Sequence, residues 1–105
     1  MSDIQQRIQT LVDGNSILLF MKGDREFPQC GFSMRAVNVV QSFGCVYKTV
    51  NVLEDPEIRQ GIKVFSNWPT IPQLYVDGNF VGGSDIMIEM YHNGELQKLV
   101  EQSAK

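Results

Sequence analysis

The sequence is poor in cysteine, in long apolar runs and in positive charge. Its two cysteines, Cys30 and Cys45, are too few for the disulfide framework of a small secreted domain. No apolar run approaches the roughly 20 residues of a transmembrane helix, so a membrane protein is not expected. The net charge of −3 gives no reason to expect binding to nucleic acid or to an anionic membrane. The first residues have no targeting character. We therefore expect a cytoplasmic protein or one from another reducing compartment, with a processed organellar protein as the alternative.

The composition is that of one small globular domain. The 105 residues are 43% hydrophobic and 20% charged, which is ordinary for a soluble protein. A chain of this length supports one modest core. Because repeats, low-complexity tracts and linkers are also missing, we expect a single domain over residues 1–105.

Apolar periodicity and turn signals divide the chain into alternating helices and strands. The unbroken apolar run 17–21 predicts a central strand covered on both faces, and Asp77-Gly78 predicts a hairpin turn. A strand–helix–strand unit at the start of the sheet predicts a parallel crossover. The expected strands are 17–21, 46–50, 73–76 and 79–81; the expected helices begin at Ser2, at Ser33, at Asp55-Pro56 and at Ile86, with a last one around Leu96. This order predicts an α/β fold with three α/β/α layers, in which a four-stranded mixed sheet is flanked by about five helices.

Three local features sharpen this assignment. Ser2 and Gln5 form a capping-box pattern at the start of the first helix. Gly44 stands where a C-cap glycine would end the second helix. Gly61, inside the third helix, is expected to weaken it by about 1 kcal/mol relative to alanine.

Cys30 lies where a polar loop gives way to the second helix. A thiol at a helix N-terminus faces unpaired backbone N–H groups and the positive end of the helix dipole. Both favour the thiolate, which is the nucleophile and the metal ligand. Three residues on, where a Cys-x-x-Cys motif would carry its second thiol, the sequence has Ser33. Cys30 therefore cannot close a local disulfide.

Four motifs together resemble one family. They are Lys22-Gly23, Cys-Gly-Phe-Ser at 30–33, Asn-Trp-Pro-Thr-Ile-Pro-Gln at 67–73, and Gly-Gly-Ser-Asp-Ile at 82–86. In this order and spacing the chain resembles a monothiol glutaredoxin of the CGFS type over essentially its whole length. The resemblance implies a thioredoxin-like fold, glutathione binding, and a [2Fe–2S] cluster that bridges a homodimer through two protein cysteines and two glutathiones. It also implies work in iron–sulfur cluster storage and delivery, with BolA-like partners and iron–sulfur client proteins.

The resemblance assigns the cationic end of a glutathione site. Cys30 would be the cluster ligand and any redox nucleophile; the alternative is a buried, inert cysteine. Lys22 would contact the glycine carboxylate and favour the Cys30 thiolate, and Arg59 would hold the same carboxylate with its guanidinium fork. The alternatives are an ordinary solvated lysine and arginine. Lys63, one turn after Arg59, is the competing cation on that helix.

The resemblance also assigns the rest of the groove. Thr70-Ile71-Pro72 would form a cis-proline loop and leave the Ile71 backbone free to pair with the cysteine of glutathione; the alternative is a trans proline at the start of an edge strand. Gly83, Ser84 and Asp85 would bind the γ-glutamyl end, with backbone N–H groups for its carboxylate and Asp85 for its ammonium. Helix capping by Ser84 or Asp85 is expected as well.

Other candidate sites are weak. Many relatives in the resembled family have a cysteine at the position of Ser84. Because this chain has a serine there, a disulfide from Cys30 to this turn is ruled out. Cys45 is expected at the edge of the core, and His92 at a solvated helix end. A zinc site built from Cys30, Cys45 and His92 lacks the usual close ligand spacing.

Three functions follow, in decreasing order of support. The first is a [2Fe–2S] carrier. The seven-residue loop between Lys22 and Cys30 supports it, because CGFS-type proteins have such a loop and dithiol glutaredoxins have a shorter one. Our hypothesis is that the longer loop shifts bound glutathione away from productive thiol exchange. The second is a glutathione-dependent oxidoreductase that reduces protein–glutathione mixed disulfides with one thiol. The third is a thioredoxin-like interaction module without thiol chemistry.

Overall fold

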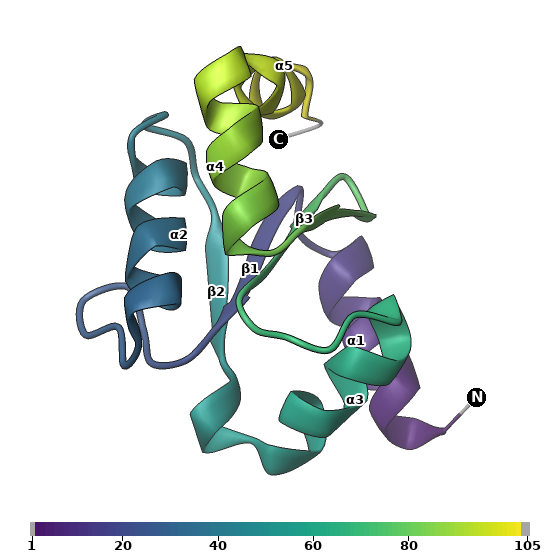
Figure 1. Cartoon of the computed structure of the whole chain (residues 1–105). Helices are drawn as coiled ribbons and strands as arrows, with labels where there is room; N and C mark the ends of the chain where they lie inside the picture. The colour runs from purple at the N-terminus through teal and green to yellow at the C-terminus, as the bar shows by residue number, and fades with distance from the viewer. Residues whose placement is uncertain (1, 104–105) are drawn as a thin grey trace.

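The computed structural model describes residues 2–103; residues 1, 104 and 105 of the expected domain lie outside this range. A four-stranded sheet has the order β2-β1-β3-β4, with helices on both of its faces (Figure 1). The strands are β1 (Ile17–Met21), β2 (Lys48–Asn51), β3 (Gln73–Val76) and β4 (Asn79–Gly82). The helices are α1 (Asp3–Asp13), α2 (Gly31–Gln41), α3 (Pro56–Ser66), α4 (Ser84–Asn93) and α5 (Glu95–Gln102), with a 3₁₀ turn η1 (Val52–Glu54). The three-layer α/β prediction is confirmed.

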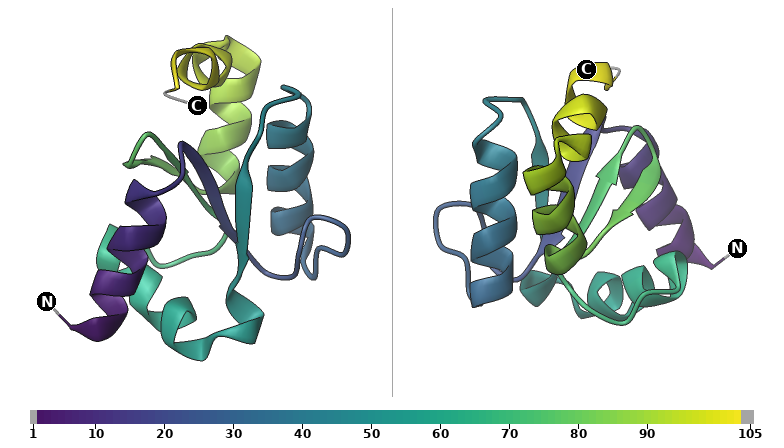
Figure 2. Two further views of the ribbon diagram at one scale, coloured as in Figure 1. Left: turned by 180° about the vertical axis from the view of Figure 1, so that it is seen from behind. Right: turned by 45° about the horizontal axis from the view of Figure 1, so that its top comes forward.

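The strand β1 lies inside the sheet, as its unbroken apolar run predicts. It pairs in parallel with β2 and antiparallel with β3, and all five of its residues are buried. Successive side chains of a strand point to opposite faces, so Leu19 joins the core under α2, α4 and α5, whereas Leu18 and Phe20 join the core under α1 and α3. The two further views show these two helical layers on either side of the sheet (Figure 2).

The hairpin turn is confirmed, and the second strand is shorter than expected. Asp77 and Gly78 both have positive φ, 51° and 81°, which is the backbone of a two-residue type I′ turn. The strand predicted at 46–50 begins only at Lys48. Its apolar first residue misled the prediction, because Val46 is 93% exposed. No helix within residues 2–103 is long and apolar enough to cross a membrane.

The glycines and the first cap differ in part from expectation. Ser2 does cap α1, but the Gln5 side chain donates to the carbonyl of Gly61 at 2.9 Å instead of closing the capping box. A Cβ at Gly61 would lie 2.9 Å from Ile4 and 3.0 Å from Ile8, so this glycine lets α1 and α3 pack closely. The helix α2 ends at Gln41, and its C-cap residue is Ser42 rather than Gly44.

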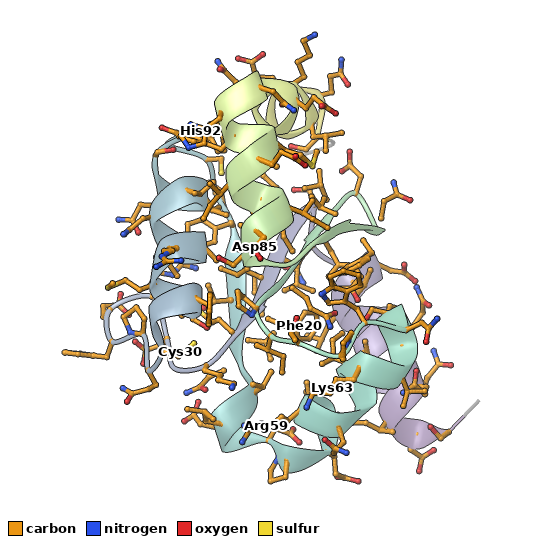
Figure 3. All side chains as sticks on the ribbon, in the orientation of Figure 1. Phe20, Cys30, Arg59, Lys63, Asp85 and His92 are labelled. Carbon is orange, nitrogen blue, oxygen red and sulfur yellow. The ribbon has the colours of Figure 1, made fainter. Side chains whose placement is uncertain are left out.

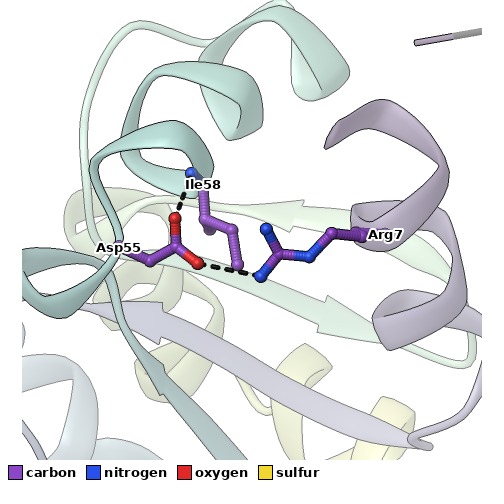
Figure 4. A network of polar contacts seen from close by, with 3 residues as sticks. All are labelled: Arg7, Asp55 and Ile58. Carbon is purple, nitrogen blue, oxygen red and sulfur yellow. Dashed lines mark hydrogen bonds and ion pairs between the residues drawn. The ribbon is translucent and has the colours of Figure 1, made fainter. Parts of the chain in front are cut away.

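An ion pair joins α1 to the start of α3. Arg7 donates to the Asp55 carboxylate at 2.8 Å, while the same carboxylate caps α3 by accepting from the Ile58 N–H at 3.2 Å (Figure 4). Both bonds favour the charged carboxylate. The Arg7 hydrogen bond, followed by the bond from Ile58, lowers the pKa of Asp55.

We predict that the stabilisation from Asp55 is lost in acid. A carboxylate with a lowered pKa in the folded state stabilises that state above its ordinary pKa of 3.8, and the effect disappears as the pH falls through the folded-state pKa. The melting temperature of Asp55→Ala should therefore be lower than that of wild type at pH 7 and at pH 5, and the difference should shrink at pH 3. Thermal unfolding followed by circular dichroism measures the two melting temperatures. Glu89→Ala, on the exposed face of α4, is the control; a gap that does not depend on pH would contradict the prediction.

Candidate functional site

Cys30 is the N-cap residue of α2. Its sulfur accepts a hydrogen bond from the Ser33 N–H at 3.3 Å, and the thiol donates to the Ser33 hydroxyl at 3.3 Å. Burial opposes ionisation of this thiol, but hydrogen bonds from the Ser33 hydroxyl and from the N–H groups of Ser33 and Phe32, together with the Lys22 charge, lower the pKa of Cys30 overall. The expected shift towards the thiolate is thus present at this position.

Ser33, at the position of the second thiol of a dithiol motif, also has a structural role. It is fully buried, and its hydroxyl also accepts from the backbone N–H of Lys22 at 3.0 Å. The serine therefore ties the end of β1 to the first turn of α2 and places its hydroxyl against the sulfur. Sequence reasoning missed this role. The available signal was a small hydroxyl residue at the N3 position, where an N-cap group receives its hydrogen bond.

We predict that Ser33→Ala raises the pKa of Cys30. The variant keeps the backbone N–H bonds but removes the hydroxyl that donates to the thiolate. The alkylation rate with iodoacetamide, measured against pH, should show a midpoint at higher pH and a slower reaction at neutral pH. Ser42→Ala, at the other end of α2, is the control. An unchanged midpoint in a folded Ser33→Ala protein would contradict the assignment.

A pocket of about 380 Å³ lies beside the start of α2. Its volume is at the lower end of the roughly 300–1,000 Å³ of small-molecule sites. Figure 3 shows Cys30 at the start of α2, Arg59 and Lys63 on α3, and Asp85 at the start of α4. The lining residues are Lys22, Phe32, Lys63, 68–72 and 83–86.

The loop before β3 forms one wall of this pocket. The Ile71–Pro72 peptide bond is cis, as predicted. Within residues 2–103 the backbone of Ile71 forms no hydrogen bond, so its N–H and C=O are available to a ligand. The buried side chain of Gln73 fixes the loop by donating to the carbonyls of Trp68 at 3.2 Å and Thr70 at 3.1 Å. This support was not foreseen from the sequence, although a glutamine in an apolar strand was a signal.

The start of α4 forms the opposite wall. Capping by Ser84 or Asp85 is a wrong prediction, because the N-cap is Gly83 and α4 has no side-chain cap. The Ser84 hydroxyl is instead buried without a hydrogen-bond partner among the described residues, as is the indole N–H of Trp68. A Cβ at Gly83 would lie 3.3 Å from the Trp68 indole nitrogen and 3.3 Å from the Pro72 carbonyl. The missing side chain therefore keeps the two walls close.

The structure brings together most of the residues expected in the groove. Lys22, Ile71, Gly83, Ser84 and Asp85 all line the pocket.

Cys30 and Arg59 are not among the lining residues of the described chain, although Phe32, two residues after Cys30, is one of them. Lys63, one turn after Arg59 on α3, is among the lining residues. Within residues 2–103, no three His, Cys, Asp or Glu side chains gather as a metal site.

Comparison with known proteins shows the family to which the chain belongs. A family model described as Glutaredoxin matches residues 17–81. An uncharacterized monothiol glutaredoxin of Synechocystis is 57% identical, over 94% of this chain and 92% of that protein. The solution structure of reduced poplar apo GrxS14 is 46% identical with a TM-score of 0.82, over 94% of this chain and 91% of that one. A buckwheat glutaredoxin–glutathione complex shares the fold, with 22% identity and a TM-score of 0.84 over 94% and 88% of the two chains. The chain therefore belongs to the glutaredoxin family and, within it, to the monothiol glutaredoxins.

Proposed function

We propose that this chain binds glutathione beside Cys30 and holds a [2Fe–2S] cluster as cargo between two copies of itself. The cluster would be stored there and passed to iron–sulfur client proteins, with a BolA-like protein as a further partner. The observation that carries this proposal is a partly exposed thiol at the start of α2, biased towards the thiolate, next to a pocket whose walls hold two polar side-chain groups without a hydrogen-bond partner among the described residues.

The chain supplies one reactive sulfur only. Ser33 occupies the dithiol position, and Cys45 lies beyond the far end of α2. An 11-residue helix is about 16 Å long, whereas a disulfide needs Cα atoms within roughly 7 Å. A [2Fe–2S] cluster is normally held by four thiolates. Two copies of Cys30 and two glutathione thiols would complete that set.

The chemistry of the pocket suits glutathione. Lys22 offers a cation for the glycine carboxylate, and the unpaired backbone of Ile71 offers a donor and an acceptor for the central cysteine residue. The start of α4 offers backbone N–H groups, with Asp85 for the γ-glutamyl ammonium. The buckwheat glutaredoxin that was solved with glutathione has this fold.

The loop that leads to Cys30 is held firmly, which favours a carrier. Gly23 donates to the Asn51 side chain at 2.9 Å, and Gln29 donates to the Lys22 carbonyl at 2.9 Å. Arg25 donates to the Tyr47 carbonyl at 2.7 Å and lies 4.1 Å over the centre of the Tyr47 ring. A fixed loop would keep bound glutathione in one place relative to the Cys30 sulfur.

Reconstitution tests the proposal directly. Apoprotein is incubated without oxygen with ferrous iron, sulfide and glutathione, then separated from free reagents. We expect the visible absorbance of a [2Fe–2S] centre, a mass near that of a dimer, and two glutathiones per cluster; omission of glutathione should abolish all three. A colourless monomer under complete conditions would overturn the proposal.

The lowered pKa of Cys30 also supports the oxidoreductase as second candidate. The thiolate would attack the glutathione sulfur of a mixed disulfide, and the protein thiolate would leave and take up a proton. A second glutathione, as thiolate, would then attack glutathionylated Cys30, giving glutathione disulfide and free Cys30. Brisk turnover of a glutathionylated peptide by a protein that loads no cluster would favour this function.

A further inference from the structure

Arg25 is a half-buried cation in the loop 23–29, and none of the four motifs includes it. This loop stands out beside the start of α2 (Figure 1). The Arg25 side chain donates to the backbone carbonyl of Tyr47 at 2.7 Å, and its guanidinium lies 4.1 Å from the centre of the Tyr47 ring. One side chain thus makes two contacts with a residue 22 positions away, just before β2.

Tyr47 is a firm anchor for these contacts. Its side chain is 8% exposed and belongs to the core under α2, α4 and α5. Its hydroxyl donates to the Gln41 side chain, at the end of α2, at 3.2 Å. A close-packed ring keeps one position, and a planar guanidinium can stack on such a ring while it donates to a carbonyl, which an ammonium cannot. The Tyr47 site therefore suits an arginine.

The base and the tip of the loop are held by different contacts. At the base, the Gln29 N–H donates to the Lys22 carbonyl at 2.9 Å. At the tip, the Asp24 carboxylate accepts from the Phe27 N–H at 2.9 Å, which is a bond within the loop. Among the described residues, the bond from Arg25 is the one hydrogen bond that joins residues 24–28 to a segment outside the loop. The tip of the loop thus depends on Arg25 for its place.

We infer that Arg25 is a positioning residue for cluster retention, because its contacts with Tyr47 latch the tip of the loop 23–29 beside Cys30. This inference rests on the proposed carrier function. The loop ends at Cys30, so a loop that swings away leaves the sulfur and the glutathione beside it open to water and to free thiols. A cluster held by thiolates is lost when its ligands are replaced, and replacement needs access. Arg25 acts through the loop and does not touch the cluster.

The competing explanation is that Arg25 only stabilises the fold as a whole. Amide hydrogen exchange of the apoprotein, followed by NMR, separates the two explanations without cluster or glutathione. The Phe27 amide reports local opening of the loop tip, which needs no global unfolding. If Arg25 holds the tip, its removal must speed exchange at Phe27; if it does not, Phe27 keeps its rate even when the melting temperature falls.

We expect the Phe27 amide to exchange roughly fivefold to thirtyfold faster in Arg25→Met than in wild type, since a charged hydrogen bond and a cation–π contact are lost. Because the cluster would be lost through the open loop, its half-life after reconstitution, at fixed glutathione, should shorten by about the same factor. Arg25→Lys, which keeps the charge but not the stacking, should fall between the two proteins.

Two control variants match the side effects of this substitution. Lys48→Met removes the same charge from the exposed residue that follows Tyr47. Asp55→Ala removes the ion pair with Arg7, which belongs to the helical layer on the other face of the sheet, and so lowers stability away from the loop. Both variants should keep the wild-type exchange rate at Phe27 and the wild-type half-life of the cluster.

The outcomes separate this inference from the proposed function. The role of Arg25 is wrong if Arg25→Met leaves the Phe27 exchange rate unchanged, or if its cluster lasts as long as that of wild type. It is also wrong if Asp55→Ala shortens the half-life as much as Arg25→Met does. In all three cases wild type still loads a cluster, and the proposed function stands. A wild type that loads no cluster overturns the proposed function, and the positioning role with it.

Discussion

Replacing Cys30 by serine is expected to abolish cluster loading and the dimer that depends on it. Serine keeps the size of the side chain and can still accept from the Ser33 N–H, which now stands 3.3 Å from the sulfur. Its hydroxyl, however, is a poor iron ligand compared with a thiolate. We expect no visible absorbance after reconstitution with iron, sulfide and glutathione, and a monomer in sedimentation velocity. The melting temperature should stay close to wild type.

Cys45→Ser is the matched control, since it removes the other thiol. Cys45 is half-buried against the core, and burial raises the pKa of its thiol, so it is poorly suited to bind iron. The Cys45→Ser protein should load a cluster as wild type does. A cluster that survives in Cys30→Ser, or one lost in a folded Cys45→Ser, would contradict the assignment of the single reactive thiol.

Among the glycine-to-alanine substitutions at Gly23, Gly44 and Gly31, Gly23→Ala is expected to lower the stability of the fold most. Gly23 has a φ of +90°, which costs a residue with a side chain about 1–2 kcal/mol. An added Cβ would also fall 2.5 Å from the Phe27 carbonyl and 2.7 Å from the Gln29 N–H nitrogen, both backbone atoms that cannot turn away. Since overpacking adds roughly 1–3 kcal/mol, we expect the free energy of unfolding to fall by about 2–5 kcal/mol. Chemical denaturation measures it.

Two other glycines separate the causes of that loss. Gly44 has a positive φ, but a Cβ there meets nothing within 4 Å, so Gly44→Ala tests backbone strain alone. Gly31 has open space and no positive φ, so Gly31→Ala should be nearly neutral. The expected order of destabilisation is Gly23, then Gly44, then Gly31. Equal losses at Gly23 and Gly44 would mean that the loop moves aside and that the overlap costs nothing.

Distorting this loop should also reach the thiol. The backbone N–H of Gln29, next to Cys30, donates to the Lys22 carbonyl. The backbone N–H of Lys22 in turn donates to the Ser33 hydroxyl. In folded Gly23→Ala protein, the pH midpoint for alkylation of Cys30 should therefore differ from that of wild type. In Gly44→Ala the midpoint should be unchanged.

Much of the fold could be read from local patterns. The hairpin at Asp77-Gly78 and the cap at Asp55 each depend on residues that are neighbours in sequence. The parallel crossover joins strands about thirty residues apart, but it follows from the strand–helix–strand order that the local patterns indicate. The start of β2 and the capping of α4 were misjudged, because Val46 and Ser84 are suited by type to a strand and to a cap. In both cases the packing around the residue, which its type does not reveal, decided the outcome.

The residue order alone shows that this chain has one candidate reactive thiol, at the start of a helix, and no second thiol nearby in sequence. It also indicates the order of helices and strands, because periodicity and turn chemistry are local. The folded arrangement was needed to see that Ser33 joins Cys30 to the end of β1, that Gln73 fixes the loop 68–72, and that Lys63 rather than Arg59 lines the pocket. These facts depend on which faces of elements far apart in the chain meet, and burial of the two cores sets those faces as a whole.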